Sequence, residues 1–251
     1  MGDNQKTVRQ KATIQGVGLH TGNLVTLTFC PTKENFGIKF QRIDIENQPI
    51  IDADVDFVTE IERGTTLTKS GASVSTVEHV LSALTGLGID NCLIEVNAQE
   101  MPIMDGSAQP FVKVLQEAGI KDFEIPKNYF VIKEPIKYVN EEKGIELIAL
   151  PDDHYNIIST IDYNSPVLGR QVAKLDHLKD FEKDISSSRT FCFLHELELL
   201  LEHNLIKGGD LSNAIVVVDK PVSQEKLDQL SSLLNRPKVE VQSSGILNNV
   251  E

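Results

Sequence analysis

A carboxylate and an imidazole stand side by side in the segment STVEHVLSALTGLGIDN, as Glu78 and His79. Such a pair can serve a hydrolytic metal site, in which the imidazole binds the metal and the carboxylate accepts a proton from water. The pair also has a structural explanation, because Ser75 and Glu78 fit the S-x-x-E capping box that begins many helices. Glu78 would then accept a hydrogen bond from the Ser75 amide and do nothing else. Taken alone, the pattern favours the capping box.

The helix positions that follow His79 make a contact with another segment possible. Ala83 and Gly86 lie at i+4 and i+7 from His79, and their small side chains allow a neighbouring segment to approach closely. The positive end of the helix dipole disfavours a charged imidazolium. We therefore expect His79 to be neutral, as a metal ligand must be.

Other sequence motifs of catalysis are absent or misplaced. GVGLHTG precedes a predicted strand instead of opening a helix, which rejects a dinucleotide-binding fingerprint. HELELLLEH does not match the H-E-x-x-H zinc motif, and its charged residues are better explained as a solvated helix face. No P-loop and no G-x-S-x-G nucleophile motif occurs. The Glu78–His79 segment thus remains the main candidate.

Composition limits the possible partners and location. The 251 residues carry a net charge of -13, which argues against nucleic acid and anionic membrane surfaces as partners. Cys30, Cys92 and Cys192 have no C-x-x-C spacing, as is typical of reduced thiols in a cytosol. No apolar run reaches membrane-spanning length. We predict a cytoplasmic protein without an integral membrane segment.

The hydrophobic pattern predicts an α+β fold with two related domains, residues 1–124 and 125–251, joined at the polar segment 121–128. Each half contains a helix, a glycine-containing loop and an apolar strand. Strands are predicted over 23–31, 91–96, 129–139, 144–151, 155–163 and 214–219, and helices over 75–88, 109–118, 188–203 and 224–234. In the first strand, alternation puts Val25, Leu27 and Phe29 on one face. Pro110 is expected near the start of the second helix and Gly119 at its end, and the charged turn 140–143 makes 129–151 a hairpin candidate. The second half offers too little helix to cover its sheet, which predicts exposed apolar strand positions there.

Five motifs, in the order GVGLHTG, STVEHVLSALTGLGIDN, MPIMDGSAQPFV, SRTF and LIKGGDLSNAIVV, together resemble the zinc-dependent UDP-3-O-acyl-N-acetylglucosamine deacetylases of lipid A biosynthesis. The likeness extends from Val8 to Glu251. It implies two α+β domains whose helices are sandwiched between two sheets, with the active site at the domain junction. It also implies a bacterium that has an outer membrane, and a UDP-acyl-sugar substrate.

The resemblance assigns roles to individual positions. Glu78 matches the general base, His79 a ligand of Zn²⁺, and Thr190 the hydroxyl that helps to hold the oxyanion. His20 lies close to the metal in the family, as a possible accessory residue, and Tyr163 matches an aromatic residue that stacks on uracil. The residues that match the acyl-chain passage and its mouth are Leu19, Phe191, Leu197, Leu205, Gly209, Leu211, Ala214 and Val216.

One family feature has no counterpart in these residues. The other two zinc ligands of the family lie in an H-K-x-x-D-x-x-G-D helix, and its general acid is a later histidine, whereas no histidine follows His203 here. A catalytic zinc normally has three protein ligands. We therefore expect the second domain to be incomplete, with an H-K-x-x-D motif beyond Glu251. Some family members also continue into a fused hydroxyacyl-carrier-protein dehydratase.

The expected activity is hydrolytic deacetylation of UDP-3-O-(3-hydroxyacyl)-N-acetylglucosamine, with the 251-residue chain inactive alone. Two alternatives remain open. The chain is either a catalytically silent module for substrate binding or protein interaction, or an unrelated zinc protein that uses His20, Glu78 and His79.

Overall fold

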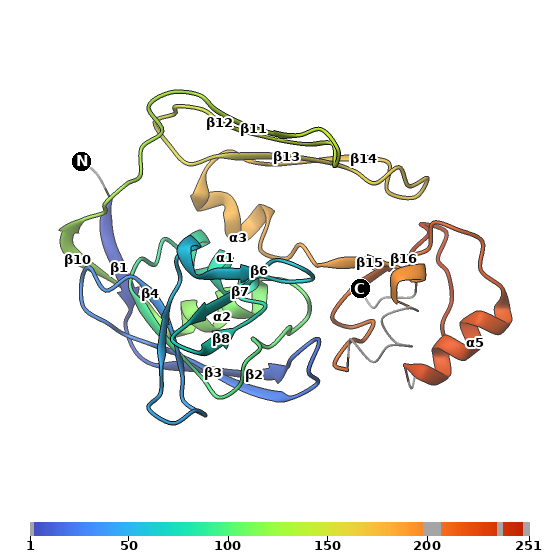
Figure 1. Cartoon of the computed structure of the whole chain (residues 1–251), viewed down its shortest axis with the longest axis horizontal. Coiled ribbons are helices and arrows are strands. Elements are labelled where there is room, and N and C mark those ends of the chain that lie inside the picture. Colours follow the sequence, from blue (N-terminus) through green and yellow to red (C-terminus); the bar gives the residue numbers. More distant parts are fainter. Residues whose placement is uncertain (1–2, 198–206, 235–237, 248–251) are drawn as a thin grey trace.

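The computed structural model describes residues 3–197, 207–234 and 238–247. It is mixed α/β, with several small sheets and few helices, which is compatible with the predicted α+β class (Figure 1). The arrangement of two domains that sandwich their helices stays a prediction, as does the boundary at residue 124. None of the helices within the described residues combines the length and apolar character that crossing a membrane requires.

The largest sheet has five strands in the order β2-β3-β9-β4-β5. Its strands are β2 (Ala12–Val17), β3 (Leu24–Cys30), β9 (Cys92–Val96), β4 (Ile38–Arg42) and β5 (Ile50–Asp52), and only β4 and β9 pair in parallel. The predicted alternation in β3 is confirmed, because Val25, Leu27 and Phe29 are all fully buried. A second sheet joins β6 (Val58–Glu60), β7 (Thr66–Lys69) and β8 (Ala72–Val74).

Two helices of the first half pack into the N-terminal core. Helix α1 (Glu78–Gly86) contacts α2 (Gln109–Ala118), and α2 also contacts β2. As predicted, Pro110 stands at the start of α2 and Gly119 ends it, with a φ of 71° that favours glycine. Both helices contribute to one buried cluster with the five-stranded sheet.

The capping-box interpretation of α1 is wrong. Val77 occupies the N-cap position and no side chain caps the helix. The Ser75 amide, which Glu78 would have bonded, donates instead to the carbonyl of Gln99. Thr76 adopts a φ of 58°, so the chain turns sharply just before the helix and moves Ser75 out of capping geometry. The Glu78 side chain is thereby free for another partner.

The close approach predicted beside α1 is confirmed at Gly86. A Cβ atom at this position would lie 2.0 Å from the ring of Phe181, in the short helix α3 (Phe181–Asp184). Phe181 is buried and belongs to the N-terminal core. A glycine on α1 thus lets an element from the second half of the sequence dock onto the first.

Replacing Gly86 by Ala is expected to lower the free energy of unfolding by about 1–3 kcal/mol. The added methyl group overlaps the Phe181 ring, and this cost exceeds the gain of about 1 kcal/mol in helix propensity. Urea denaturation of the purified chain measures the difference. Thr85→Ala, an exposed position on the same helix, is the matched control and should change stability by about 0.5 kcal/mol or less. Equal stability of Gly86→Ala and wild type would contradict the packing argument.

The predicted polar linker at 121–128 is wrong. Residues Ile120–Pro126 form strand β10, which pairs antiparallel with β1 (Asn4–Val8). Ile120, Phe123 and Ile125 are half-buried and the other residues of the strand are exposed. Their spacing is irregular, because the register with β1 shifts between Asn4 and Lys6, and the charged residues between them concealed the strand.

Two hairpins begin the second half, and both extend to one side of the molecule (Figure 1). β11 (Ile136–Asn140) and β12 (Ile145–Ala149) flank the predicted turn, and β13 (Ile157–Asp162) pairs with β14 (Arg170–Leu175). The prediction of uncovered apolar strand positions is confirmed for the described residues. The exposed large side chains on these strands include Tyr138, Val139, Ile145, Leu147, Ile148, Ile157, Ile158 and Val172.

A second buried cluster forms near the end of the chain. The helix predicted over 188–203 begins late, because Phe191–Phe193 first forms strand β15, which pairs in parallel with β16 (Ile215–Val217). Helical backbone then covers 194–197, the last residues described before the gap. α5 (Gln224–Leu233) is confirmed and is capped by the Ser223 hydroxyl. The cluster comprises Leu194, Leu197, Leu211, Val216, Val218, Leu227, Leu230, Val239 and Leu247.

Candidate active site

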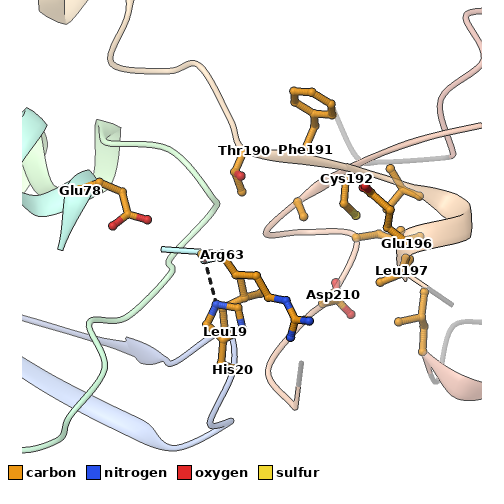
Figure 2. Close-up of a pocket in the computed structure, with 15 residues that line it drawn as sticks. Leu19, His20, Arg63, Glu78, Thr190, Phe191, Cys192, Glu196, Leu197 and Asp210 are labelled. Atoms are coloured by element: carbon orange, nitrogen blue, oxygen red, sulfur yellow. Dashed lines mark hydrogen bonds between the residues drawn. The ribbon is translucent and has the colours of Figure 1, made fainter. Parts of the chain in front are cut away.

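A pocket of about 610 Å³ opens between segments of the N-terminal core and of the C-terminal cluster (Figure 2). Among the residues named from the sequence, those that line it are Leu19, His20, Glu78, Thr190, Phe191, Leu197, Gly209, Leu211, Ala214 and Val216. All of them except Leu197 come from four of the five motifs, which the fold therefore brings to one place. One part of the lining carries carboxylate, imidazole and hydroxyl groups, and another part is aliphatic and aromatic.

Glu78 is held by a neighbour outside its own helix. Its Oε2 atom accepts a hydrogen bond of 3.0 Å from the Thr65 amide, in the connection between β6 and β7. The Val77 amide in turn donates to the Thr65 carbonyl, which fixes this connection against the start of α1. Figure 2 shows the carboxylate directed toward the space below Thr190. Glu78 is half-buried, so its second oxygen is available to a ligand.

His79 is half-buried beside Glu78 but does not line the pocket. Burial lowers the pKa of its imidazole, while the charges of Glu78 and Asp105 act in the opposite direction. The net direction agrees with the expected neutral ring, although the cause is burial and not the helix dipole on which the expectation was based.

The residues around His79 do not by themselves make a zinc site. Across residues 3–197, 207–234 and 238–247, a group of three close ligand atoms occurs only at Asp152, Asp153 and His154, which are exposed. His154 already pairs with both carboxylates, and its pKa is raised mainly by its hydrogen bond to Asp153. His79 therefore has too few partners in the described part of the chain to hold a catalytic metal.

Thr190 is fixed by backbone hydrogen bonds on both sides. Its amide donates to the Gly106 carbonyl at 2.8 Å, and its carbonyl accepts from the Ile215 amide at 2.9 Å. Gly106 has a φ of 85°, and a Cβ there would lie 2.1 Å from the Asn213 carbonyl oxygen. Only glycine permits this approach. The short side chain of Thr190 is thereby directed toward the pocket (Figure 2).

Arg189 joins three of the motifs and was missed by the sequence analysis. Its Nε atom donates to the Asp105 carbonyl at 2.7 Å, and a terminal nitrogen donates to the Leu211 carbonyl at 3.3 Å. A guanidinium can satisfy two carbonyls at once because its donors form a fixed fork. Every residue has a backbone carbonyl, so no pattern of residue types in the sequence could have indicated this contact.

Backbone hydrogen bonds join the first motif, GVGLHTG, to the last, LIKGGDLSNAIVV. The Gly208 amide donates to the Leu19 carbonyl at 3.0 Å, and the Lys207 amide donates to the His20 carbonyl at 3.3 Å. A Cβ at Gly208 would lie 2.2 Å from the Gly18 carbonyl oxygen. The pair of glycines in KGGD therefore permits a contact that places Leu19 and His20 at the pocket.

The remaining predicted residues lie next to the pocket or outside the described residues. Tyr163 does not line the pocket, but its ring packs edge-on against that of Phe191 with a centroid distance of 5.3 Å. It is half exposed. Leu205 lies outside the described residues.

The structure adds lining residues to which the sequence assigned no role in the site, namely Arg63, Cys192, Glu196, Asp210 and Leu234. Burial, followed by the charge of Glu196, raises the pKa of the Cys192 thiol to about 11. A thiol in this state is neutral at physiological pH and packs like a small apolar group. Cys192 therefore extends the apolar part of the lining.

Cys192 is expected to react slowly with iodoacetamide. At pH 8, a thiol of pKa about 11 is roughly 100-fold less ionised than one at the ordinary value of 9.0, and only the thiolate attacks. Peptide mass spectrometry should find alkylation about 100-fold slower than for N-acetylcysteine, with Cys192→Ser confirming the peptide. Because the pKa is raised, the rate should keep rising tenfold per pH unit from pH 8 to pH 10. A rate that levels off above pH 9 would contradict the raised pKa.

The fold and the pocket define an α+β protein with a polar and apolar cavity suited to an amphipathic small molecule. A family model described as UDP-3-O-acyl N-acetylglycosamine deacetylase matches residues 5–230. The chain belongs to this family.

Curated relatives agree with this assignment. A bifunctional enzyme LpxC/FabZ of Porphyromonas gingivalis is 46% identical over 245 residues, covering 98% of this chain and 53% of the relative. One of Chlorobaculum tepidum is 42% identical, covering 99% of this chain and 54% of the relative. A UDP-3-O-acyl-N-acetylglucosamine deacetylase of Myxococcus xanthus is 43% identical, covering 85% of this chain and 68% of the relative. The chain thus spans about half the length of the two bifunctional relatives.

Proposed function

We propose that this chain forms part of a cytoplasmic deacetylase that hydrolyses the N-acetyl group of UDP-3-O-(3-hydroxyacyl)-N-acetylglucosamine in lipid A biosynthesis. The observation that carries the proposal is the meeting of Glu78 and Thr190 with an aliphatic passage in one pocket. Family membership supports a deacetylase of an acylated UDP-sugar. An amide is a poor electrophile, so its hydrolysis needs both an activated water and a stabilised oxyanion.

Glu78 is the proposed general base. Its Oε2 is occupied by the Thr65 amide, and this hydrogen bond fixes the carboxylate while the other oxygen remains available. The carboxylate accepts a proton as water attacks the acetyl carbonyl, a contribution of about 10²–10⁴ in rate for a positioned base. The Thr190 hydroxyl donates a hydrogen bond to the oxyanion that forms on the substrate, and the rigid backbone around Thr190 holds it for this task.

The apolar lining is the proposed passage for the acyl chain. Leu19 lies at one side, and the segments 191–197 and 209–216 supply the other lining residues. Neutral Cys192 adds to this apolar surface. The ring of Tyr163 is half exposed and packs edge-on against Phe191. It is the proposed stacking surface for uracil. A substrate with a polar nucleotide at one end and a lipid chain at the other matches this division.

A catalytic Zn²⁺ is proposed for the complete site, with His79 as one ligand. A zinc ion in such enzymes lowers the pKa of water and polarises a carbonyl. The burial that lowers the pKa of His79 supports a neutral ligand. Because the described residues provide no full ligand set, we propose that residues beyond these 251 supply the others, in an H-K-x-x-D helix, together with the general acid. The 251-residue chain alone should then be inactive.

The uncovered strands β11–β14 agree with this proposal, since a further segment of the protein would bury their apolar side chains. The bifunctional relatives make a fused dehydratase a further proposal for the natural polypeptide.

A second candidate is a catalytically silent module that binds the acyl-sugar without hydrolysing it. The incomplete ligand set around His79 within the described residues favours it. Release of acetate from UDP-3-O-(3-hydroxyacyl)-N-acetylglucosamine by the natural polypeptide separates the two. We expect turnover of the acylated substrate and little turnover of UDP-N-acetylglucosamine, which lacks the chain that fills the passage. Binding of the acylated substrate without acetate release would favour the silent module.

A further inference from the structure

Glu100 is a buried carboxylate to which neither the pocket lining nor the proposed chemistry gives a role. It is only 1% exposed. A buried charge is costly unless hydrogen bonds satisfy it. The donors that reach it are two backbone amides and two hydroxyl groups, all of them neutral. Four donors that converge on one buried carboxylate indicate that the fold requires an anionic acceptor at residue 100.

Three of these donors come from the loop that brings Leu19 and His20 to the pocket. The His20 amide donates to Oε1 at 2.9 Å, and the Thr21 amide and hydroxyl donate to Oε2 at 2.9 and 2.7 Å. Successive amides that converge on one anion form a concave binding turn. A Cβ at Gly18 would lie 2.5 Å from Oε2, so glycine there allows the carboxylate to approach. Glu100 therefore determines the conformation of this loop.

The fourth donor belongs to the turn that leads into Glu78. The Thr76 hydroxyl lies 3.4 Å from Oε1, and Thr76 has a φ of 58°, an unfavourable conformation for a β-branched residue. Backbone contacts reinforce this junction, because the Met101 amide donates to the Ser75 carbonyl. One carboxylate thus holds two segments that are distant in sequence, one ending in His20 and one preceding Glu78.

On the pocket side, both segments contact a third one, the connection between β6 and β7. His20 Nε2 lies 3.3 Å from the Arg63 carbonyl, and Glu78 bonds the Thr65 amide in the same connection (Figure 2). A displacement of the Glu100 clamp would therefore move the base relative to the rest of the pocket.

We propose that Glu100 is a positioning residue of the deacetylase, which clamps the Leu19–Thr21 loop and the Thr76 turn and so fixes the base Glu78 relative to His20. The catalytic part of this inference rests on the proposed function, whereas the clamp itself does not. Glu100→Gln tests it. Glutamine keeps one of the two oxygens at nearly the same side-chain volume, so in either orientation its NH2 group faces a backbone donor, the amide of His20 or that of Thr21.

The first experiment measures amide hydrogen exchange of the 251-residue chain by NMR. In Glu100→Gln, the amides of His20 and Thr21 should exchange at least about tenfold faster, because one of them then faces the glutamine NH2 group and the clamp that holds both is weakened. The amides of Phe29 and Ile94, in the buried strands β3 and β9, should be unchanged. The matched control is Glu95→Gln on β9, whose carboxylate pairs with Lys11 and does not touch the loop. Unchanged protection at His20 and Thr21, or equally faster exchange at Phe29 and Ile94, would overturn the clamp.

The second experiment measures kcat and KM for acetate release by the natural polypeptide. After correction for the folded fraction, Glu100→Gln should lower kcat by about 10- to 100-fold and change KM much less, because the base is misplaced while the apolar passage persists. Glu95→Gln should match the wild type. An unchanged kcat despite faster loop exchange would overturn the positioning role. A wild-type polypeptide without deacetylase activity would overturn the proposed function and the positioning role together, but the exchange result would still decide on the clamp.

Discussion

Replacing Glu78 by Gln in the natural polypeptide should lower kcat for acetate release by about 10²–10⁴-fold. Glutamine keeps an oxygen that can accept the hydrogen bond from the Thr65 amide, so the local structure should persist. It cannot accept a proton from water, and this property is what the proposed role requires. KM should change little, because the change removes an interaction that matters only in the transition state.

Steady-state kinetics with the acylated substrate measure this effect. Glu117→Gln, at an exposed position of α2, makes the same chemical change away from the pocket and should leave kcat as in wild type. Circular dichroism of both variants should match that of the wild type. A Glu78→Gln enzyme that retains more than about a tenth of the wild-type kcat would exclude Glu78 as the base.

Replacing Thr190 by Val should lower kcat by about 10²–10³-fold, the usual loss when one donor to an oxyanion is removed. Valine has nearly the same shape and keeps both backbone hydrogen bonds of residue 190, to Gly106 and from Ile215. The only group lost is the hydroxyl that points toward the pocket.

Thr190→Ser supplies the informative comparison, because it restores the hydroxyl and removes the methyl group. It should recover most of the activity that Thr190→Val loses. Thr13→Val, an exposed threonine on β2, is the control for the Thr-to-Val change itself. Equal loss in the serine and valine variants would mean that the methyl packing, and not the hydroxyl, is required.

Local patterns predicted several elements of this fold correctly. The alternation in β3, the proline and glycine that bound α2, and the turn between β11 and β12 depend on interactions between residues close in sequence. The close approach at Gly86 was also predictable, because small residues on one helix face indicate a neighbour. Its identity was not, since Phe181 lies far away in the sequence.

The errors arose where tertiary contacts override local preference. The S-x-x-E pattern before α1 predicted a cap, but the left-handed turn at Thr76 removes Ser75 from capping geometry and Glu78 bonds Thr65 instead. The segment 121–128 looked like a linker because its charged residues conceal an irregularly spaced, half-buried strand that pairs with β1. Both errors concern partners that only the folded chain brings together.

In the candidate site, too, sequence patterns predicted some residues, and others depend on contacts that only the fold creates. Motif order identified most residues that line the pocket, including Glu78 and Thr190. Arg189 and Glu100 escaped notice, because they act on backbone carbonyls and amides that leave no pattern of residue types. The roles assigned to the lining residues remain predictions that the variants above test.

Acetate release from UDP-3-O-(3-hydroxyacyl)-N-acetylglucosamine, measured in parallel for the natural polypeptide and for the 251-residue chain at equal zinc concentration, tests the central claim most directly. We predict turnover by the natural polypeptide and none by the 251-residue chain, because His79 belongs to no group of three close ligand atoms among the described residues. Turnover by the 251-residue chain, or no turnover by either, would contradict the account.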